Sequence, residues 1–473
     1  PSINGTDGTA LIQTTCSSPS SNATHHFRLE RMAASGNRFR IRNTIQNRCI
    51  DVANGDTRTN RRVHFWNCQS LTSGRNQNWT LGGAASAGFG SGAAPTVAQA
   101  DAARLLQQAT FGPTASEINR VVSLGYDAWI TDQFNRPASS HLAIHQAIHN
   151  ELSPHLGGDV EDIACEFSYP CQLTRHDTWW QISVRGEDQL RQRVAFALSQ
   201  FFVISEVSDN VGYSQQAISD YYDTLAVHGL GNYRTLLEEV TLHPLMGRYL
   251  GMLQNEKADP RTNSEPDENF AREVMQLFSI GLIELNIDGT PRLDANGNTI
   301  PTYDNVRITN LARALTGWNF SNATRWWNWE DDVKLPGLIN SMTPWTASGV
   351  ETYHDKGAKT LLNGVTLPAG GTARSELRAA LDNLHNHPNV GPFLARHLIQ
   401  RLVTSNPSPA YIGRVATVFN NNGSGVRGDM RAVVRAILMD AEARSATSTQ
   451  QYGYGKVKEP MLRFSAVLRA FGA

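Results

Sequence analysis

The sequence predicts a small strand-rich N-terminal part followed by a larger, mainly α-helical part. The chain has 473 residues, which exceeds the length at which one hydrophobic core usually keeps growing, so two domains are expected. Residues 82–96, GGAASAGFGSGAAPT, are almost all Gly, Ala and Ser and cannot bury enough apolar surface to become ordered. We therefore expect domains at 1–81 and 98–473, joined by a flexible linker at 82–97.

The spacing of apolar residues supports this division. Before the linker, the runs RFRIRNT and VHFWNC alternate with the two-residue period of strands. After it, stretches such as AARLLQQA, DQLRQRVAFALSQFFVI and ENFAREVMQLFSIG show helical spacing. Residues 285–305 interrupt the helices with Asp-Gly and Asn-Gly turns and predict a small hairpin. The DANGN run within it lacks the full pattern of a calcium loop, so we expect a plain turn.

Composition excludes several classes of function. Charged residues make up 18% of the chain and the net charge is -1, so there is no basic surface for nucleic acid. No window reaches the roughly 18 consecutive apolar residues of a transmembrane segment. No nucleotide-binding or serine-nucleophile motif occurs, and we predict no cofactor. The chain starts at Pro1 without a leader, and we expect it to be a processed or partial sequence.

The five cysteines indicate an oxidising compartment. Cys49 and Cys68 are closely spaced, as are Cys165 and Cys171, in the manner of local disulfide loops rather than zinc sites. We expect these two bridges. They leave Cys16, whose partner we expect upstream of this sequence. Disulfides predict a secreted or cell-surface protein.

Residues 49–81, CIDVANGDTRTNRRVHFWNCQSLTSGRNQNWTL, contain the side chains of a sugar site. Binding a sugar in water needs an aromatic face for the ring and carboxylate or amide groups for the hydroxyls. The four candidates are Asp51, Trp66, Asn76 and Gln77.

The motifs C-I-D, F-W-N-C and N-Q-N-W resemble one repeat of the ricin-type β-trefoil lectins. The resemblance covers about residues 25–82 and implies an incomplete β-trefoil, because a trefoil has three repeats. It implies that Asp51 and an Asn bond galactose-like hydroxyls and that Trp66 stacks on the ring. Gln77 and Trp79 match the largely structural Gln-x-Trp signature. A degenerate repeat that folds without binding sugar is the alternative.

From about residue 98, the chain resembles the bacterial family called domain of unknown function 1800. The resemblance rests on ARLLQQATFGPT, RQRVAFALSQFFVIS, PDENFAREVMQLFSIGL, YHDKGAKTLL and HPNVGPFLARHLIQRLVTSNPSPAY. It covers nearly all of 98–473 and implies no reaction. It also implies a family domain that continues beyond Ala473.

The densest polar cluster of the helical part is PDENFAREVMQLFSIG, residues 266–281. Glu273 lies beside an apolar stripe, so we expect it to be partly buried with a raised pKa, as a general acid requires. An ordinary Glu-Arg pair is the alternative. For Glu268 we expect an ion pair with Arg272 four residues later. As partners of Glu273 in hydrolysis, we name Asp267 and Asp331.

Two further sets of residues are candidates for binding. The run RALTGWNFSNATRWWNWEDD supplies Trp318, Trp326, Trp327 and Trp329, which are a candidate sugar platform or else a loop fastened by buried indoles. His141, His145 and His149 lie at helical spacing and are weak metal candidates. For YHDKGAKTLL, with His354, Asp355 and Lys359, we expect satisfied turn residues rather than an acid/base or metal pair.

Together these features predict a secreted carbohydrate-binding protein whose helical domain acts on a polysaccharide or glycan. A tethered lectin raises the concentration of substrate near a second domain. The alternative is a non-catalytic extracellular adhesin or matrix protein, and a weaker one is a metal or haem oxidoreductase. Whether the chain is an enzyme, and whether it forms an oligomer, stays open at this stage.

Overall fold

A computed structural model describes residues 97–156, 169–208, 211–212, 214–327, 335–445 and 453–472, together with six short strands between residues 9 and 80. The chain divides into two compact units. Unit 1 holds residues 1–97, 114–117 and 467–473, and unit 2 holds residues 98–113 and 118–466. The predicted linker lies outside the described residues, apart from Val97.

Unit 1 contains one antiparallel sheet, with strand order β1-β5-β4-β3-β2 and with β6 paired to β3. The strands are β1 (Thr9–Ala10), β2 (Phe27–Arg31), β3 (Arg38–Asn43), β4 (Arg48–Val52), β5 (Val63–Asn67) and β6 (Trp79–Thr80). In its register, Cys49 lies opposite Trp66 and Asp51 opposite His64. The predicted strand-rich segment thus forms strands. The side chains of the lectin candidates Asp51, Trp66, Asn76 and Gln77 lie outside the described part, as do those of all five cysteines, so the sugar site, the trefoil and the bridges stay predictions.

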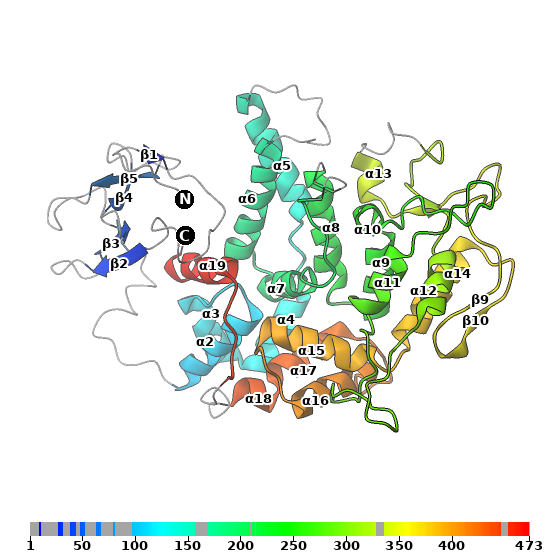
Figure 1. Ribbon diagram of the computed structural model, residues 1–473. Helices are drawn as coiled ribbons and strands as arrows, with labels where there is room; N and C mark the ends of the chain where they lie inside the picture. Colours follow the sequence, from blue (N-terminus) through cyan, green and yellow to red (C-terminus); the bar gives the residue numbers. More distant parts are fainter. Residues whose placement is uncertain are drawn as a thin grey trace. The chain divides into compact units, whose positions relative to one another are not determined.

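Helices dominate the remainder of the described chain, as the sequence predicts (Figure 1). They are α2 (Val97–Ala109), α3 (Ala115–Leu124), α4 (Tyr126–Asn135), α5 (His141–Leu156), α6 (Tyr169–Arg185), α7 (Gln189–Leu198), α8 (Gln215–His228), α9 (Tyr233–Leu242), α10 (Pro244–Leu250), α11 (Asn269–Gln276), α12 (Asn305–Ala314), α13 (Leu335–Ile339), α14 (Ala373–His385), α15 (Val390–Leu402), α16 (Pro409–Asn420), α17 (Met430–Met439), α18 (Ala441–Arg444) and α19 (Pro460–Phe471). Short strands pair as β7 (Trp318–Asn319) with β8 (Thr343–Pro344) and as β9 (Lys359–Thr360) with β10 (Thr366–Leu367). The mainly α-helical fold with small antiparallel hairpins is therefore confirmed.

The helices begin where the sequence offers capping groups. Thr372 accepts a hydrogen bond from the backbone N–H of Ser375, and Ser375 Oγ accepts one from the backbone N–H of Thr372, which makes a capping box at the start of α14. At the start of α12, the Asp304 side chain accepts a hydrogen bond from the backbone N–H of Arg307. These side chains satisfy backbone donors that the first helical turn leaves unpaired.

One continuous core joins most of unit 2. It includes the fully buried side chains of Trp129, Tyr233 and Phe278 from segments far apart in the sequence. The Tyr233 hydroxyl donates to the carbonyl of Phe278, so even a polar atom within this core is paired. Helices α15, α16 and α17 pack side by side (Figure 1).

Helix α7 is buried on every face, since all ten of its residues are shielded from solvent. Its apolar residues belong to the core, and its polar residues bond the backbone of neighbouring segments. Arg191 donates to the carbonyls of Ala226 and Phe134, and Arg193 donates to that of Arg401. A helix hydrophobic on one face alone could not occupy this position.

The predicted hairpin at 285–305 is present as a turn-rich excursion. Leu285 pairs with Pro291, and Leu293 pairs with Thr299. The Asp294 carboxylate accepts the backbone N–H groups of Asn296 and Asn298. The aspartate therefore stabilises a turn, which confirms the structural role that we expected for DANGN.

His385 makes the stability of the fold depend on pH. The ring is buried against Tyr233 and Phe419. Burial, together with the charges of Arg427 and Arg234, lowers the pKa of His385 from 6.5 to about 4. Between these values the unfolded chain binds a proton that the folded chain does not, so acidification favours unfolding.

We predict that His385→Gln flattens the loss of stability between pH 6.5 and 4. The lowered pKa corresponds to a loss on the order of 3 kcal/mol over this pH range. Urea unfolding followed at several pH values measures this loss. Asn386→Gln, at the exposed end of α14, is the control, because it changes no titrating group, and it should keep the parental slope. An unchanged slope in His385→Gln would show that other groups dominate the acid response.

Candidate functional site

The tryptophan-rich segment divides into buried and exposed side chains. Trp318 lies on β7 and is 0% exposed, and Trp326 is 5% exposed, whereas Trp327 is 64% exposed. Trp318 and Trp326 therefore cannot be a sugar platform, and for them the alternative of buried, fastening indoles is correct. Trp329 lies outside the described residues. The indole of Trp327 is exposed enough for a sugar ring to stack on it.

The buried indole of Trp326 is the centre of an aromatic cluster. Its ring stacks on Tyr353 at 4.0 Å between centroids, with 11° between the planes. Trp345 and Trp327 approach it edge-on at 6.2 and 6.3 Å. We call these four side chains the tryptophan cluster.

Glu256 holds two members of this cluster. Its Oε1 atom accepts from Nε1 of Trp326 at 2.6 Å and from Nε1 of Trp327 at 3.2 Å. The carboxylate is half-buried, and the exposed indole is thus fixed by a hydrogen bond to a charged acceptor. An aromatic face beside a carboxylate is the pair of groups that a sugar requires.

The loop that carries Glu256 is fastened on both sides. Gln254, with φ of 58°, donates from Nε2 to the carbonyl of Trp326 and to Oδ1 of Asn319. Asn255 exchanges two hydrogen bonds with the backbone of Asp267, at 2.8 and 2.9 Å. These bonds connect the tryptophan cluster to the segment that leads into α11.

Helix α11 carries Glu273 on its flank. The side chain is half-buried, and burial raises the pKa of Glu273 above its ordinary value of 4.5, while the charge of Arg272 opposes the shift. Its Oε2 atom is buried and has no hydrogen-bond partner among the described residues. The structure thus gives Glu273 the partial burial and the direction of pKa shift expected of a general acid.

Of the two expected carboxylate partners of Glu273, the structure describes Asp267. Asp267 is exposed in the turn before α11, where its Oδ1 atom accepts the backbone N–H of Asn269. Asp331 lies outside the described residues. Glu268 pairs with Arg272 at 3.3 Å, as expected.

The histidines of α5 make hydrogen bonds to separate partners. His141 and His145 are buried, with His141 Nε2 bonded to Gln192 at 2.9 Å and His145 Nδ1 bonded to Ser219 at 2.9 Å. His149 is half-buried. Among the described residues, no group of three or more His, Cys, Asp or Glu side chains is arranged to hold a metal ion.

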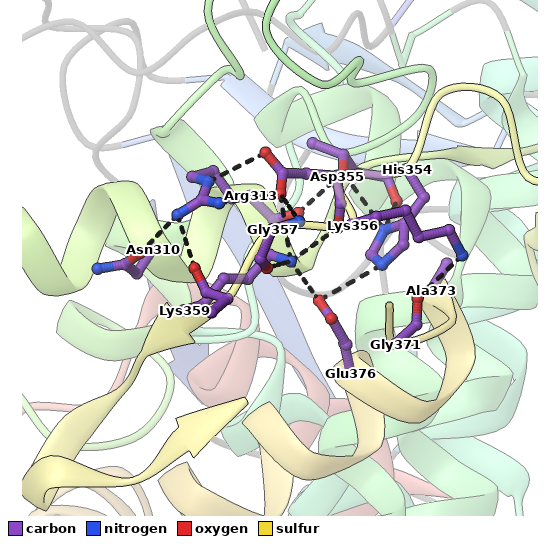
Figure 2. A network of polar contacts seen from close by, with 12 residues as sticks. Asn310, Arg313, His354, Asp355, Lys356, Gly357, Lys359, Gly371, Ala373 and Glu376 are labelled. Carbon is purple, nitrogen blue, oxygen red and sulfur yellow. Dashed lines mark hydrogen bonds and ion pairs between the residues drawn. The ribbon is translucent and has the colours of Figure 1, made fainter. Parts of the chain in front are cut away.

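A buried ion network joins the segment around residue 355 to α14. Figure 2 shows that the side chains of His354 and Lys359 both point toward the carboxylate of Glu376. Lys359 Nζ lies 2.7 Å and His354 Nε2 lies 3.4 Å from Glu376 Oε2, and the three side chains are at most 3% exposed. Lys359 also donates to the carbonyls of Asp355 and Gly357, so each of the three N–H groups of its ammonium has an acceptor.

Asp355 extends this network to α12. Its two oxygens accept from Nε and Nη2 of Arg313 at 3.0 Å each, which is a bidentate pair. Burial of Asp355 acts to raise its pKa, but hydrogen bonds from Arg313 and from the Gly357 N–H outweigh burial and hold the pKa below 3.8. His354 and Lys359 are fully buried, and Asp355 is largely buried, so the three side chains have structural roles in ion pairs and turns. Within this network, Nε2 of His354 and Oε1 of Glu376 have no hydrogen-bond partner among the described residues.

A family model described as Protein of unknown function (DUF1800) matches residues 104–473. The chain belongs to this family. Neither a curated protein nor a solved structure matches the chain. The DUF1800 match begins beyond the N-terminal strands, where the lectin resemblance stays a prediction. None of the described helices has both the length and the apolar composition needed to cross a membrane.

Sequence reasoning missed two carboxylates that hold together distant segments of the DUF1800 domain, Glu256 and Glu376. Glu256 lies 70 residues before Trp326 in a loop without periodicity, so no pattern associates the two. Glu376 lies in the first turn of α14, where an acidic residue is expected merely to favour the helix dipole. Only the folded chain shows that it neutralises Lys359.

We predict that Lys359→Met lowers the free energy of unfolding of the DUF1800 domain by about 3–5 kcal/mol, because it leaves the buried Glu376 carboxylate without its cation. The control is Lys356→Met, which removes an exposed lysine paired with Glu351 and should cost less than about 1 kcal/mol. Chemical denaturation measures both. Equal costs would mean that the buried pair contributes no more than the exposed one.

We also predict that Glu273→Gln stabilises the protein at pH 7, because an ionised, half-buried carboxylate with an unpaired oxygen disfavours the folded state. The gain should disappear below about pH 4.5, where the carboxyl is protonated in both states. Glu268→Gln, on the same segment but paired with Arg272, should not stabilise. Thermal unfolding across pH tests this, and destabilisation by Glu273→Gln at pH 7 would contradict it.

Proposed function

We propose that the protein is an extracellular carbohydrate-binding protein whose helical unit binds a glycan at Trp327 and Glu256. The supporting observation is the 64% exposed indole of Trp327, fixed by the Glu256 carboxylate and backed by the buried ring of Trp326. An exposed indole held in one orientation offers an aromatic face on which a sugar ring can stack. Its rigidity lowers the entropy lost when a sugar ring stacks on it.

The chemistry of this surface suits a neutral sugar. The indole face covers the apolar side of a pyranose ring, and Oε2 of Glu256 is the oxygen that does not hold an indole. A carboxylate oxygen accepts hydroxyl hydrogens in a fixed direction. The N-terminal candidates Asp51, Trp66, Asn76 and Gln77 would add a second, galactose-like site, as their lectin resemblance implies. Secretion rests on the expected disulfides.

We further propose that the helical unit acts on the bound glycan, with Glu273 as the general acid. Its raised pKa and its unpaired Oε2 atom support this role. The bonds between Asn255 and Asp267 connect α11 directly to the loop of Glu256. The base or nucleophile of such a reaction would come from Asp267 or Asp331. A non-catalytic adhesin would share the binding surface and lack the reaction.

Binding is tested with the full chain on a panel of insoluble and galactose-containing polysaccharides. We predict that Trp327→Ala, made in an Asp51→Ala background to silence the N-terminal candidate, weakens binding roughly tenfold through the lost ring stacking. The control is Phe464→Ala, which removes another exposed aromatic ring, 54% exposed, on α19. Equal binding by Trp327→Ala and its background would exclude this surface.

The same panel tests catalysis through release of new reducing ends. Release by the parent that disappears in Glu273→Gln, while binding persists, would establish a glycan-cleaving enzyme. Binding without release from any polysaccharide would establish the adhesin.

A further inference from the structure

Three Asn-Gly pairs lie in turns or loops of the described part of the chain. They are Asn296-Gly297, Asn363-Gly364 and Asn422-Gly423. The backbone N atom of a residue can attack the amide of a preceding asparagine, and it does so most readily in glycine, which has no Cβ to shield it. At each of these three glycines, an added Cβ would meet no heavy atom within 4 Å. The three pairs are therefore alike in sequence and in access to the glycine.

The pairs differ in what holds the asparagine side chain. Asn422 is half-buried, its Nδ2 atom donates to Oδ2 of Asp429 at 2.7 Å, and its Oδ1 atom accepts two backbone N–H groups at 2.9 and 3.2 Å. Asn296 and Asn363 are exposed, and their side chains make no hydrogen bond to a described residue. Turning the amide toward the glycine N atom thus breaks three hydrogen bonds at Asn422 and none at the other two.

We propose that Asn296 and Asn363 are sites of spontaneous deamidation, from which the fold protects Asn422. The glycine N atom forms a bond to Cγ of the asparagine, the bond from Cγ to Nδ2 breaks, and ammonia leaves a five-membered succinimide. Water then opens this ring at either carbonyl, which gives aspartate or isoaspartate. One water is added and one ammonia is lost, so no oxidant is needed. Each event adds one negative charge at neutral pH.

At Asn363 the two products have different effects on the fold. Asn363 and Gly364 have φ of 56° and 74°, and the N–H of Val365 donates to the carbonyl of Leu362 at 3.2 Å. This tight turn joins β9 to β10, and Asn-Gly or Asp-Gly is favoured where both central residues have positive φ. Aspartate keeps this backbone. Isoaspartate lengthens the main chain by one carbon atom, which disturbs the pairing of β9 and β10 and so the position of Lys359 on β9.

The test is to incubate the folded full chain in mildly alkaline buffer and to follow the three pairs by peptide mapping. We expect conversion at Asn296 and at Asn363 to be roughly a hundredfold faster than at Asn422, the factor that three ordinary hydrogen bonds supply. The chain kept unfolded in guanidinium chloride is the control, and there the three rates should converge. Equal rates in the folded chain would overturn the proposal, as would conversion of Asn296 and Asn363 in the unfolded chain alone.

The effect on the hairpin is tested with a variant of matched charge. Protein that carries isoaspartate at 363, isolated by ion exchange, should have a lower Tm than Asn363→Asp, which adds the same charge on an unchanged backbone. Asn363→Asp itself should keep the Tm of the parent, because Asp-Gly suits the same turn. Equal Tm values for the isoaspartate form and Asn363→Asp would overturn the assigned effect on β9 and β10.

Discussion

The structure depends on how unit 2 buries polar groups inside a helical core. Helix α7 is enclosed on all sides, yet it carries Arg191, Gln192 and Arg193 in succession. Each of the two arginines bonds a backbone carbonyl of a neighbouring segment, so the helix fixes its neighbours by directional contacts as well as by apolar packing. Such contacts exclude shifted packings that a wholly apolar helix would tolerate.

A second buried set, the network of Lys359, Glu376, His354, Asp355 and Arg313, fixes loops rather than helices. Its members come from α12, α14 and the segment between them, and each ammonium or guanidinium meets a carboxylate. The segment from 351 to 376 has little regular structure, so ion pairs replace the backbone ladders that would otherwise order it. Tyr353, beside this network, is thereby held against Trp326.

The proposed general acid differs from this network in its exposure. The side chains of Lys359, His354 and Glu376 are at most 3% exposed, so a ligand cannot reach them. Glu273 is half-buried, and its Oε2 atom has no hydrogen-bond partner within the described residues. An unpaired atom also occurs in the network, at Oε1 of Glu376. Exposure therefore separates the two sets of residues, whereas pairing does not.

Sequence alone determined the class of the fold. Helical spacing after the Gly/Ala/Ser segment predicted a mainly α-helical part, because burial of one helical face imposes its period on the sequence. The Asp-Gly and Asn-Gly turns predicted the excursion at 285–305 because they favour tight turns. Local pattern also placed Glu273 beside an apolar stripe and so anticipated its partial burial.

Only the tertiary structure decided which polar and aromatic residues meet. Trp318 and Trp327 look alike in the sequence, yet one is in the core and the other is exposed, because exposure depends on what packs against a residue from elsewhere in the chain. Glu256 and Trp326, like Lys359 and Glu376, are brought together by contacts that no local period encodes. Local periodicity reports which face of an element is buried, whereas a site depends on contacts between elements.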